Sequence, residues 1–410
     1  DVTFDDQPRA RATTNPSGDF SAPIRIPASA LPGPHTVQAT GESSGLSAQA
    51  PFAVRTDWPQ FHFTPQHTGL NPYENVLSPE NVGGLQVAWT FTATDGFLSS
   101  PEVGGGRVFA GAKDTMYGLD AATGALLWKH REPLADMVDS AVWRGVLYYP
   151  TTLGDVHAVR AATGKPIWTW AAGAGIFGGV TLAQGVIYVG AANGRTYALD
   201  ARTGHELWRA DTPSSVFPAP AVAGGVVYVA TTGLFKLYAL DAATGDILWT
   251  GDMGYESESS PAVADGMVYV GSDDDTLYAF DASGCGQAQC SPVWTATTGS
   301  SSQSSPAVAY GRVYVGSNDH YIYAFDAATG ALDWRFQTGG AIQLGSPAIA
   351  NGVVYCGSFD HNIYAQDAAT GAELWHYTAG DEMNTAPAVA DGVLYMGTFD
   401  HNLYAFHLPG

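Results

Sequence analysis

The sequence is poor in basic residues and contains no long hydrophobic run. Only 17 of its 410 residues are Lys or Arg, against 39 Asp or Glu, which gives a formal net charge of −22. A chain this acidic is repelled by phosphate backbones and by anionic lipid, so nucleic acid and membrane surfaces are poor candidates as partners. No apolar stretch approaches the roughly 20 residues that a membrane span needs, and we therefore expect no membrane-spanning segment.

The sequence also has little cysteine, and three cysteines are too few for a disulfide scaffold. Cys285 and Cys290 lie close together in the turn-like segment CGQAQC, which favours one local disulfide and an exported setting, extracellular or at the cell surface. A pair of reduced thiols is the alternative, although the spacing differs from that of a metal-binding CxxC pair. Cys356 lies in an apolar run, where we expect a buried and unreactive thiol.

A repeat of about 40 residues fills most of the chain, a period in the range that indicates β-propellers. One interval is longer than the others, and it contains the Cys285 to Cys290 segment, so the additional residues fall in a loop of one repeat. Eight tryptophans mark the repeat, and we assign them a structural role: Trp89, Trp128, Trp168, Trp208, Trp249, Trp294, Trp334 and Trp375.

Each repeat predicts four β-strands. One unit reads SPAVADG, MVYVGSDDD and TLYAFDA, followed by a turn and a short strand that ends in a tryptophan, here Trp294. Alternating Val and Tyr mark the strands, while Asp265-Gly266 and Asn351-Gly352 supply the positive φ that tight hairpins need. Four-stranded antiparallel sheets repeated around an axis form a propeller, and an open solenoid is the alternative.

The two ends of the repeat region complement each other. Residues 384–407 supply three strands of a repeat and stop before a tryptophan, whereas residues 85–91 supply an isolated strand of the kind that ends in a tryptophan, with no repeat of its own. Pairing these segments closes the ring and removes the exposed edges that an open array leaves. We therefore predict an all-β fold, with an eight-bladed β-propeller over residues 85–410 that is closed by its N-terminal strand.

Residues 1–56 have a different sequence pattern, with strand-like segments between turns rich in Pro, Gly and Ser. They predict a partial immunoglobulin-like β-sandwich, because a whole domain of this kind needs about 100 residues. Such a fragment has an unpaired edge, which favours a partner strand or self-assembly through residues 1–56. Residues 57–84 form a lead segment between the two parts.

The phrase AxDxxTGxxxW recurs along the chain, for example as ALDAATGDILW at 239–249 and AFDAATGALDW at 324–334. It resembles the tryptophan-docking motif of the quinoprotein alcohol dehydrogenase-like family, the propellers named after pyrroloquinoline quinone (PQQ). The lead segment is also similar to that of the family, so the resemblance covers about residues 58–410. Asp and Thr-Gly form the turn of the motif, and the tryptophan lies against the neighbouring blade.

The resemblance implies a fold that serves both cofactor enzymes and non-enzymatic assembly proteins. In the enzymes, the quinone is implied to lie over the central channel between a Trp and a disulfide of adjacent cysteines, with a calcium ion and a catalytic Asp. This chain has no adjacent cysteines, Leu98 stands where the first blade of the family carries a Glu, and the repeats lack long insertions. We therefore expect neither catalytic residues nor a cofactor.

Three successive repeats carry a histidine after an aspartate in the turn between their second and third strands: His320, His361 and His401. An arc of His and Asp side chains suits metal binding or pH sensing. The alternative is that repetition copied a favourable turn, because Asp and Asn stabilise hairpins through bonds to the backbone.

A second set of candidate residues lies closer to the predicted axis, three residues before the strand-opening proline of the aligned repeats. Glu258, Gln303 and Asn384 occupy this position, and Asp139 lies one step further in. Together they suit a cation or a polar ligand, and a hydrated channel rim is the alternative. Trp170, which we place in a connection between blades, suits stacking against a ligand.

These features favour an exported, non-catalytic propeller that presents its channel face or its sandwich edge to a protein or glycan partner. The alternative is a dehydrogenase of alcohols or sugars that depends on PQQ and calcium. The sequence does not identify which residues would bind a metal ion.

Overall fold

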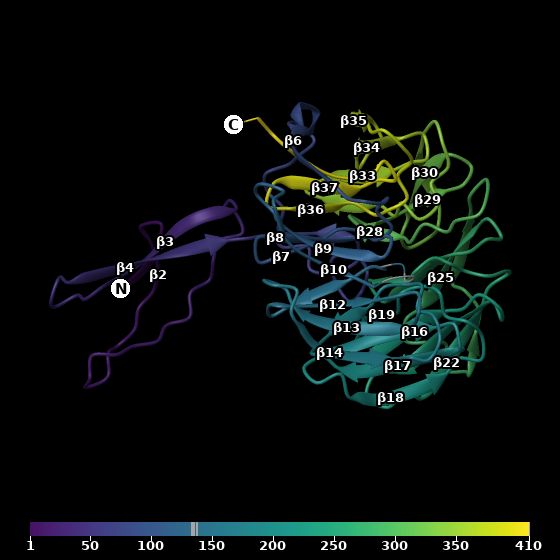
Figure 1. Cartoon of the computed structure of the whole chain (residues 1–410), viewed down its shortest axis with the longest axis horizontal. Coiled ribbons are helices and arrows are strands. Elements are labelled where there is room, and N and C mark those ends of the chain that lie inside the picture. Colours follow the sequence, from purple (N-terminus) through teal and green to yellow (C-terminus); the bar gives the residue numbers. More distant parts are fainter. Residues whose placement is uncertain (133–135, 137, 410) are drawn as a thin grey trace.

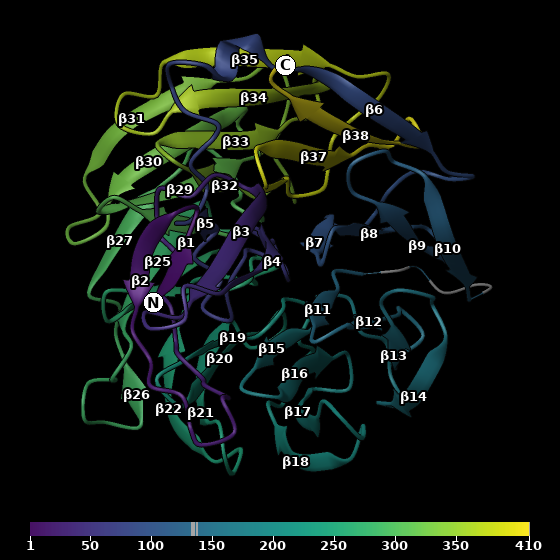
Figure 2. The same ribbon diagram turned by 90° about the vertical axis from the view of Figure 1, so that its left-hand side faces the viewer.

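The computed structural model describes residues 1–132, 136 and 138–409. Nearly all regular structure in this part of the chain is β-strand, accompanied by one short 3-10 helix, η1 (Val82–Gly84). A small N-terminal sheet lies to one side of a ring of sheets (Figure 1). In the view of Figure 2 the sheets of the ring radiate from a common centre, which is the arrangement of a β-propeller.

Eight sheets, or blades, form the ring within the described residues. Blade 1 contains β7 (Glu102–Gly104), β8 (Arg107–Ala112), β9 (Thr115–Asp120) and β10 (Leu126–Arg131), and blade 2 contains β11 (Ala141–Trp143), β12 (Val146–Pro150), β13 (Asp155–Arg160) and β14 (Pro166–Ala171). Blade 3 contains β15 (Thr181–Ala183), β16 (Val186–Ala191), β17 (Arg195–Asp200) and β18 (Glu206–Asp211), and blade 4 contains β19 (Ala221–Ala223), β20 (Val226–Ala230), β21 (Lys236–Asp241) and β22 (Ile247–Asp252). Blade 5 contains β23 (Ala262–Ala264), β24 (Met267–Gly271), β25 (Thr276–Asp281) and β27 (Trp294–Thr297), and blade 6 contains β28 (Ala307–Ala309), β29 (Arg312–Ser317), β30 (Tyr321–Asp326) and β31 (Leu332–Gln337). Blade 7 contains β32 (Ala348–Ala350), β33 (Val353–Gly357), β34 (Asn362–Asp367) and β35 (Glu373–Thr378), and blade 8 contains β36 (Ala388–Ala390), β37 (Val393–Gly397), β38 (Asn402–His407) and β6 (Gln86–Thr92).

The ring closes as the sequence predicts. Strand β6, from before the first blade, pairs antiparallel with β38 at the end of the chain, and Trp89 lies opposite Ala405. Figure 2 shows the two strands side by side. The predicted all-β propeller, closed by its N-terminal strand, is therefore confirmed.

The burial of each strand follows from its place in the blade. In blade 5 the second and third strands, β24 and β25, are buried along almost their whole length, because neighbouring blades cover both faces. The outermost strand β27 alternates between buried and exposed residues. The hairpin turns have the predicted geometry, since Asp265 has a φ of 49° and Asn351 a φ of 43°.

The recurring AxDxxTGxxxW phrase docks each blade against the next. In blade 6 the carboxylate of Asp326 accepts bonds from the backbone and hydroxyl of Thr329, at 2.9 and 2.7 Å, and so fixes the turn. The ring of Trp334 then lies over Gly371 in the corresponding turn of blade 7, so closely that a Cβ on this glycine would lie 2.6 Å from the ring. The glycine of the motif therefore supplies both a positive φ and room for a tryptophan.

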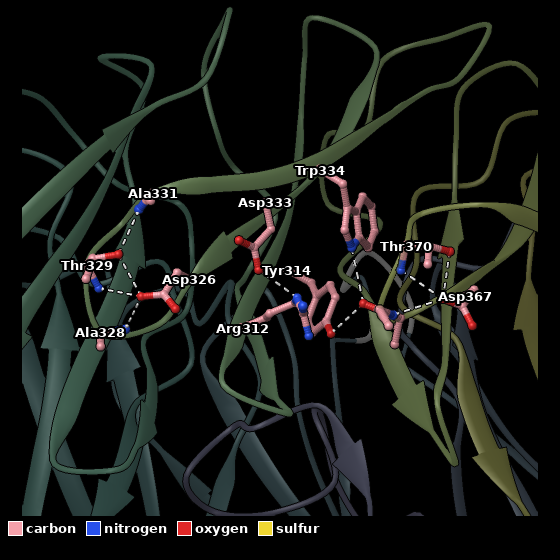
Figure 3. Close-up of polar contacts among 12 residues, drawn as sticks. Arg312, Tyr314, Asp326, Ala328, Thr329, Ala331, Asp333, Trp334, Asp367 and Thr370 are labelled. Atoms are coloured by element: carbon pink, nitrogen blue, oxygen red, sulfur yellow. Dashed lines mark hydrogen bonds and ion pairs between the residues drawn. The ribbon is translucent and has the colours of Figure 1, made fainter.

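The docking also uses a shared hydrogen-bond acceptor. The indole of Trp334 and the hydroxyl of Tyr314 both donate to the carbonyl of Ala368, at 3.2 and 3.0 Å. Figure 3 shows the two dashed lines that meet at this acceptor. Six of the marker tryptophans donate to an alanine carbonyl of the neighbouring blade: Trp89, Trp128, Trp168, Trp208, Trp294 and Trp334.

The other two marker tryptophans face blades without the standard turn. Trp249 packs on Gly284 at the start of the long insert, which the Cys285–Cys290 disulfide closes and whose β26 (Gln289–Cys290) pairs parallel with β22. Trp375 packs against Phe406, whose strand β38 ends at His407 without such a turn. Cys356 is buried as expected, and burial raises the pKa of its thiol.

The N-terminal part contains one four-stranded sheet among its described residues, in the order β2 (Gln7–Ala10), β1 (Val2–Phe4), β3 (Gly33–Thr40), β4 (Ser47–Val54). A second sheet packed on it, which a sandwich requires, does not occur in residues 1–56. The immunoglobulin-like assignment thus stays a prediction. Every residue of β4 except the last is exposed, and β4 forms one edge of the sheet.

The lead segment has a role that the sequence did not reveal, because residues 58–71 bind the innermost strand of every blade. The middle residue of the inner strand donates its N–H to an oxygen of this segment in blades 1 to 7, at distances from 2.7 to 2.9 Å. In blade 8 the carbonyl of Val389 accepts from the side chain of Asn71 at 2.8 Å. The short strand β5 (Leu70–Asn71) also adds to blade 7, in parallel with β32.

Two histidines of the lead segment are buried on the axis. His67 approaches the carbonyl of Pro261 at 3.2 Å and the hydroxyl of Thr181 at 2.9 Å, while His62 stacks on Phe61. Burial lowers the pKa of His62 to about 4 and that of His67 to about 3, so both are neutral at physiological pH. The lead segment therefore crosses the centre of the ring as a packed structure.

Candidate functional site: a cavity on the propeller axis

A cavity of about 400 Å³ lies on the axis of the ring. Phe61 of the lead segment contributes to its lining, and the connections that enter each blade supply most of the remainder. The eight aligned residues that lie three positions before Pro101 or its counterpart all line the cavity, one from each blade: Leu98, Val138, Phe177, Phe217, Glu258, Gln303, Leu344 and Asn384.

One side of the cavity is apolar. Phe177 and Phe217, from neighbouring blades, have ring centroids 4.8 Å apart. Phe177 is 44% exposed and Leu98 is 41% exposed on this side, whereas Leu344, which is 42% exposed, lies between Gln303 and Asn384 on the other side. Large apolar side chains that stay exposed around one concave surface are typical of a binding site, whereas isolated ones are ordinary.

The other side of the cavity carries the predicted polar residues. Gln303 reaches Asp273 and Asn318 at 3.4 Å each, and Asn384 accepts the N–H of Leu344 at 2.9 Å. The carboxylate of Glu258 has no hydrogen-bond partner within the described part of the chain. Burial, together with the carboxylates of Asp273 and Glu256, raises the pKa of Glu258.

Asp139 lines the cavity beside a buried carboxyl that sequence reasoning missed. Asp139 accepts the N–H of Ser100 at 2.6 Å, while burial raises its pKa to about 6. Behind it, Glu102 is fully buried and bonds to the backbone and hydroxyl of Ser140. Burial and the neighbouring Asp139 raise the pKa of Glu102 well above its usual range and so favour its protonated form.

The cavity has charge of one sign. Asp136, Asp139 and Glu258 belong to its lining, and no Lys, Arg or His is found among the described lining residues. Low-dielectric walls concentrate the field of such groups, so the cavity attracts cations and repels anions.

The three histidines of the second candidate set lie elsewhere, in the turns between second and third strands. His320, His361 and His401 have φ values of 73°, 71° and 71°, a conformation that His tolerates better than most residues. The aspartate before each histidine accepts a Tyr hydroxyl of its own blade and a Gly N–H of the preceding connection; in blade 7, Asp360 does so at 2.6 Å for both.

These bonds give the aspartates a structural role in the turn. No group of three or more His, Cys, Asp or Glu side chains placed to hold a metal ion occurs in the described residues. The arrangement agrees with the alternative interpretation, in which repetition copied a favourable turn.

Trp170 differs from its expected place. It belongs to the outermost strand β14, opposite Val156, and is not in a connection between blades. Its ring packs edge-on against Tyr197 of blade 3 at 4.8 Å, so it covers a seam between blades and lies outside the cavity lining. The signal that misled the prediction is its position just beyond the marker Trp168.

The fold and the site thus define a β-propeller with an acidic cavity on its axis. A family model described as outer membrane protein assembly factor BamB matches residues 86–170, 152–254, 236–358 and 339–408. The chain belongs to this family of PQQ-like propeller repeats. No curated protein matches the chain.

Several solved structures have a similar fold. BamB from Moraxella catarrhalis is 17% identical with a TM-score of 0.66, and the match covers 79% of this chain and 99% of that one. Quinohemoprotein alcohol dehydrogenase from Comamonas testosteroni is 16% identical with a TM-score of 0.73, over 87% of this chain and 81% of that one. The computationally designed protein Ika8 is 18% identical with a TM-score of 0.68, over 78% of this chain and 99% of that one. Likeness at this level of identity shows the fold alone.

Proposed function

We propose that this protein is an exported, non-catalytic propeller that binds a partner through its channel face. The observation that carries the proposal is the axial cavity, where exposed apolar side chains face a carboxylate without a protein partner. A site of this kind is suited to recognition, because apolar surface supplies affinity and a few polar groups supply orientation.

The cavity lining is a poor fit for the cofactor of the related enzymes. PQQ is a tricarboxylate, and the described lining offers it three carboxylates and no cationic side chain. The disulfide joins Cys285 and Cys290 in the insert of blade 5, outside the lining, and the described lining residues include no Trp. Calcium prefers six to eight oxygen ligands, and the described residues bring no suitable cluster together.

The nature of the partner rests on weaker support. The family is described as an assembly factor, which is by name a protein that acts on other proteins. We therefore place a protein first among the candidate partners and a glycan second. The disulfide between Cys285 and Cys290 supports export, since disulfides persist in oxidising compartments. Within the described residues, no helix combines the length and apolar character required to cross a membrane.

The edge strand β4 is the second candidate surface. Thr36 and Thr40 bond to the β1 side of the sheet, through Asp5 and Asp1. Pro51 and Ser47 are the residues of β4 that pair with Thr36 and Thr40. Their backbone polar groups therefore face the free edge of the sheet. Pro51 has no N–H to offer there, which limits the edge to short pairings, so self-assembly through it is the weaker proposal.

A groove of about 450 Å³ lies next to β4, between the N-terminal sheet and the lead segment. Phe52 and Tyr73 belong to its lining, and its charged lining residues are Arg25 and Arg55. In a chain with 39 acidic and 17 basic residues this groove stands out as positive. A partner bound at the sheet edge would therefore carry carboxylates next to apolar side chains.

A dehydrogenase that depends on PQQ and calcium is the second candidate. It is favoured by the fold shared with the Comamonas testosteroni enzyme and with a europium-containing methanol dehydrogenase. The two candidates are separated by titrating the purified chain with PQQ and Ca²⁺, first by tryptophan fluorescence and then by dye-coupled oxidation of simple alcohols. We expect no saturable quenching; saturation with turnover would overturn the non-catalytic proposal.

A further inference from the structure

We propose that the axial cavity binds an organic ammonium ion, in which a primary amine is joined to an aromatic or branched apolar body. The ammonium group lies at Glu258, and the apolar body covers Phe177 and Phe217. This inference rests on the proposed function, since it takes the channel face as the binding surface and names the class of ligand.

The shape and composition of the cavity are the first argument. Its volume of about 400 Å³ falls within the range of about 300–1,000 Å³ that is usual for small-molecule sites. Its apolar side is exposed although the rest of the propeller interior is closely packed. Because this exposure costs hydration free energy, a ligand that covers Phe177 and Phe217 gains affinity from the apolar area that it buries.

The order of residues around the ring is the second argument. Phe177, Phe217 and Glu258 come from blades 3, 4 and 5 in succession, so the aromatic pair borders the carboxylate. An ammonium ion between them interacts with the carboxylate and with the negative face of an aromatic ring. A neutral alcohol loses the ion pair, and a carboxylic acid is repelled.

The cavity wall is also pre-organised at this point. The N–H of Ala219 donates to the hydroxyl of Ser260 at 3.0 Å, two residues after Phe217 and Glu258. The same bond recurs from Ser260 to Ser305 and from Ser305 to Ser346, each at 2.9 Å. These bonds join the connections of blades 4 to 7, and a rigid wall reduces the entropy that binding would otherwise cost.

The electrostatics of Glu258 point the same way. The neighbouring carboxylates of Asp273 and Glu256 disfavour its negative charge. One oxygen of Asp273 is buried without a hydrogen-bond partner in the described structure. A bound cation offsets this repulsion, whereas an anion increases it.

The proposal is tested by calorimetric titration of the full chain with three probes of matched shape, which are phenethylamine, phenethyl alcohol and hydrocinnamate. We expect the amine to bind with an affinity at least about tenfold above that of the alcohol, because the charge-assisted bond is lost in the alcohol. The acid should not bind. A capped Lys-Phe dipeptide forms a further arm, and tighter binding of this peptide would assign the ammonium to a side chain of a partner protein.

Variants locate the site. Glu258→Gln removes one charge without removing a hydrogen bond within the protein, and should weaken amine binding about tenfold at an unchanged thermal midpoint. The control Glu373→Gln lies on the outer strand β35 and should bind as the parent does. Phe217→Leu keeps an apolar wall and should weaken phenethylamine while sparing an aliphatic amine.

Equal binding of the three probes, or full affinity in Glu258→Gln, would overturn the ammonium proposal. Binding of a neutral sugar in preference to the amine would overturn it in favour of a glycan. These outcomes are distinct from failure of the proposed function, which would appear as PQQ-dependent turnover. If neither the amine nor PQQ binds, the ammonium proposal fails while the non-catalytic proposal stands.

Discussion

The shared acceptor between blades 6 and 7 predicts a non-additive response to mutation. The carbonyl of Ala368 accepts from both Trp334 and Tyr314, at 3.2 and 3.0 Å, and Ala368 is 3% exposed. Trp334→Phe or Tyr314→Phe alone leaves the carbonyl with one donor. The double variant leaves it buried with neither, and thus adds a desolvation cost that no single variant carries.

The magnitudes follow from typical hydrogen-bond energies. Each lost bond costs about 1 kcal/mol, and an unsatisfied buried carbonyl costs a further 1–3 kcal/mol or so. Trp334→Phe also loses about 1–2 kcal/mol of apolar burial. The double variant should therefore be less stable than the sum of the singles by about 1–3 kcal/mol, which is the coupling energy of the cycle.

Blades 2 and 3 provide a matched control. Trp168 donates to the carbonyl of Ala201 at 3.1 Å, but Tyr148 makes no hydrogen bond to it in the described structure. The rings of Trp168 and Tyr148 are 5.8 Å apart, as are those of Trp334 and Tyr314, so coupling through ring packing is similar in both pairs. The control cycle should be additive within about 0.5 kcal/mol.

Both cycles are measured by urea unfolding followed by tryptophan fluorescence and far-ultraviolet circular dichroism. Coincident transitions by the two probes justify comparing free energies. A coupling energy near zero for Trp334 and Tyr314, or one equal to that of the control, would refute the argument that the shared carbonyl links the blades.

Further predictions concern the turns, the lead segment and the N-terminal sheet. Gly245→Ala should lower the thermal midpoint more than Gly225→Ala, because both glycines have positive φ, 79° and 83°, but only a Cβ on Gly245 would meet a tryptophan ring, at 2.7 Å. Acid should destabilise the ring through His62 and His67, because their lowered pKa values mean that the unfolded chain binds protons first as pH drops from about 6.5 toward 4. Asp139 and Glu102 have raised pKa values and act in the opposite direction, so calorimetric scans should compare the parent with His67→Gln, which should lose less stability on acidification. Equal losses in the two proteins would contradict the burial of His67 in the neutral form. Removing residues 1–54 should leave a folded ring, since β1 to β4 form a sheet of their own; if sizing chromatography finds the full chain already monomeric, self-assembly through this part is abandoned.

The ring could be predicted from the sequence because the same motif of turn and strand residues recurs in almost every repeat. Asp, Thr-Gly and Trp stand at fixed spacing, and each does in the structure what its chemistry suggests: the aspartate fixes a turn and the tryptophan covers the next blade. Closure also followed from pattern, since residues 85–91 offered a strand that only the last blade lacked.

The role of the lead segment could not be predicted in the same way. Residues 58–71 bind the blades chiefly through backbone oxygens, and backbone groups leave no signature in the side-chain pattern. The sequence also gives no sign that His62 and His67 are buried, because histidine is intermediate in its tendency to be buried.

The candidate site was predicted in part. Counting back from each strand-opening residue placed Glu258, Gln303 and Asn384 on one ring, and the structure places all three in the cavity lining. The apolar members of the ring were visible, but the contact between Phe177 and Phe217 depends on how neighbouring blades meet. Glu102 belongs to a strand, so only the three-dimensional arrangement reveals its contact with Ser140 and Asp139.

We propose that the acidic cavity on the axis is the binding site of this propeller. A crystal structure of the protein with para-bromophenethylamine tests it most directly, since the anomalous signal of bromine locates the ring of the ligand. We expect one bromine peak beside Phe177 and Phe217, with the amine facing Glu258. A bromine peak in the groove beside β4, or no peak in the cavity at saturating amine, would contradict it.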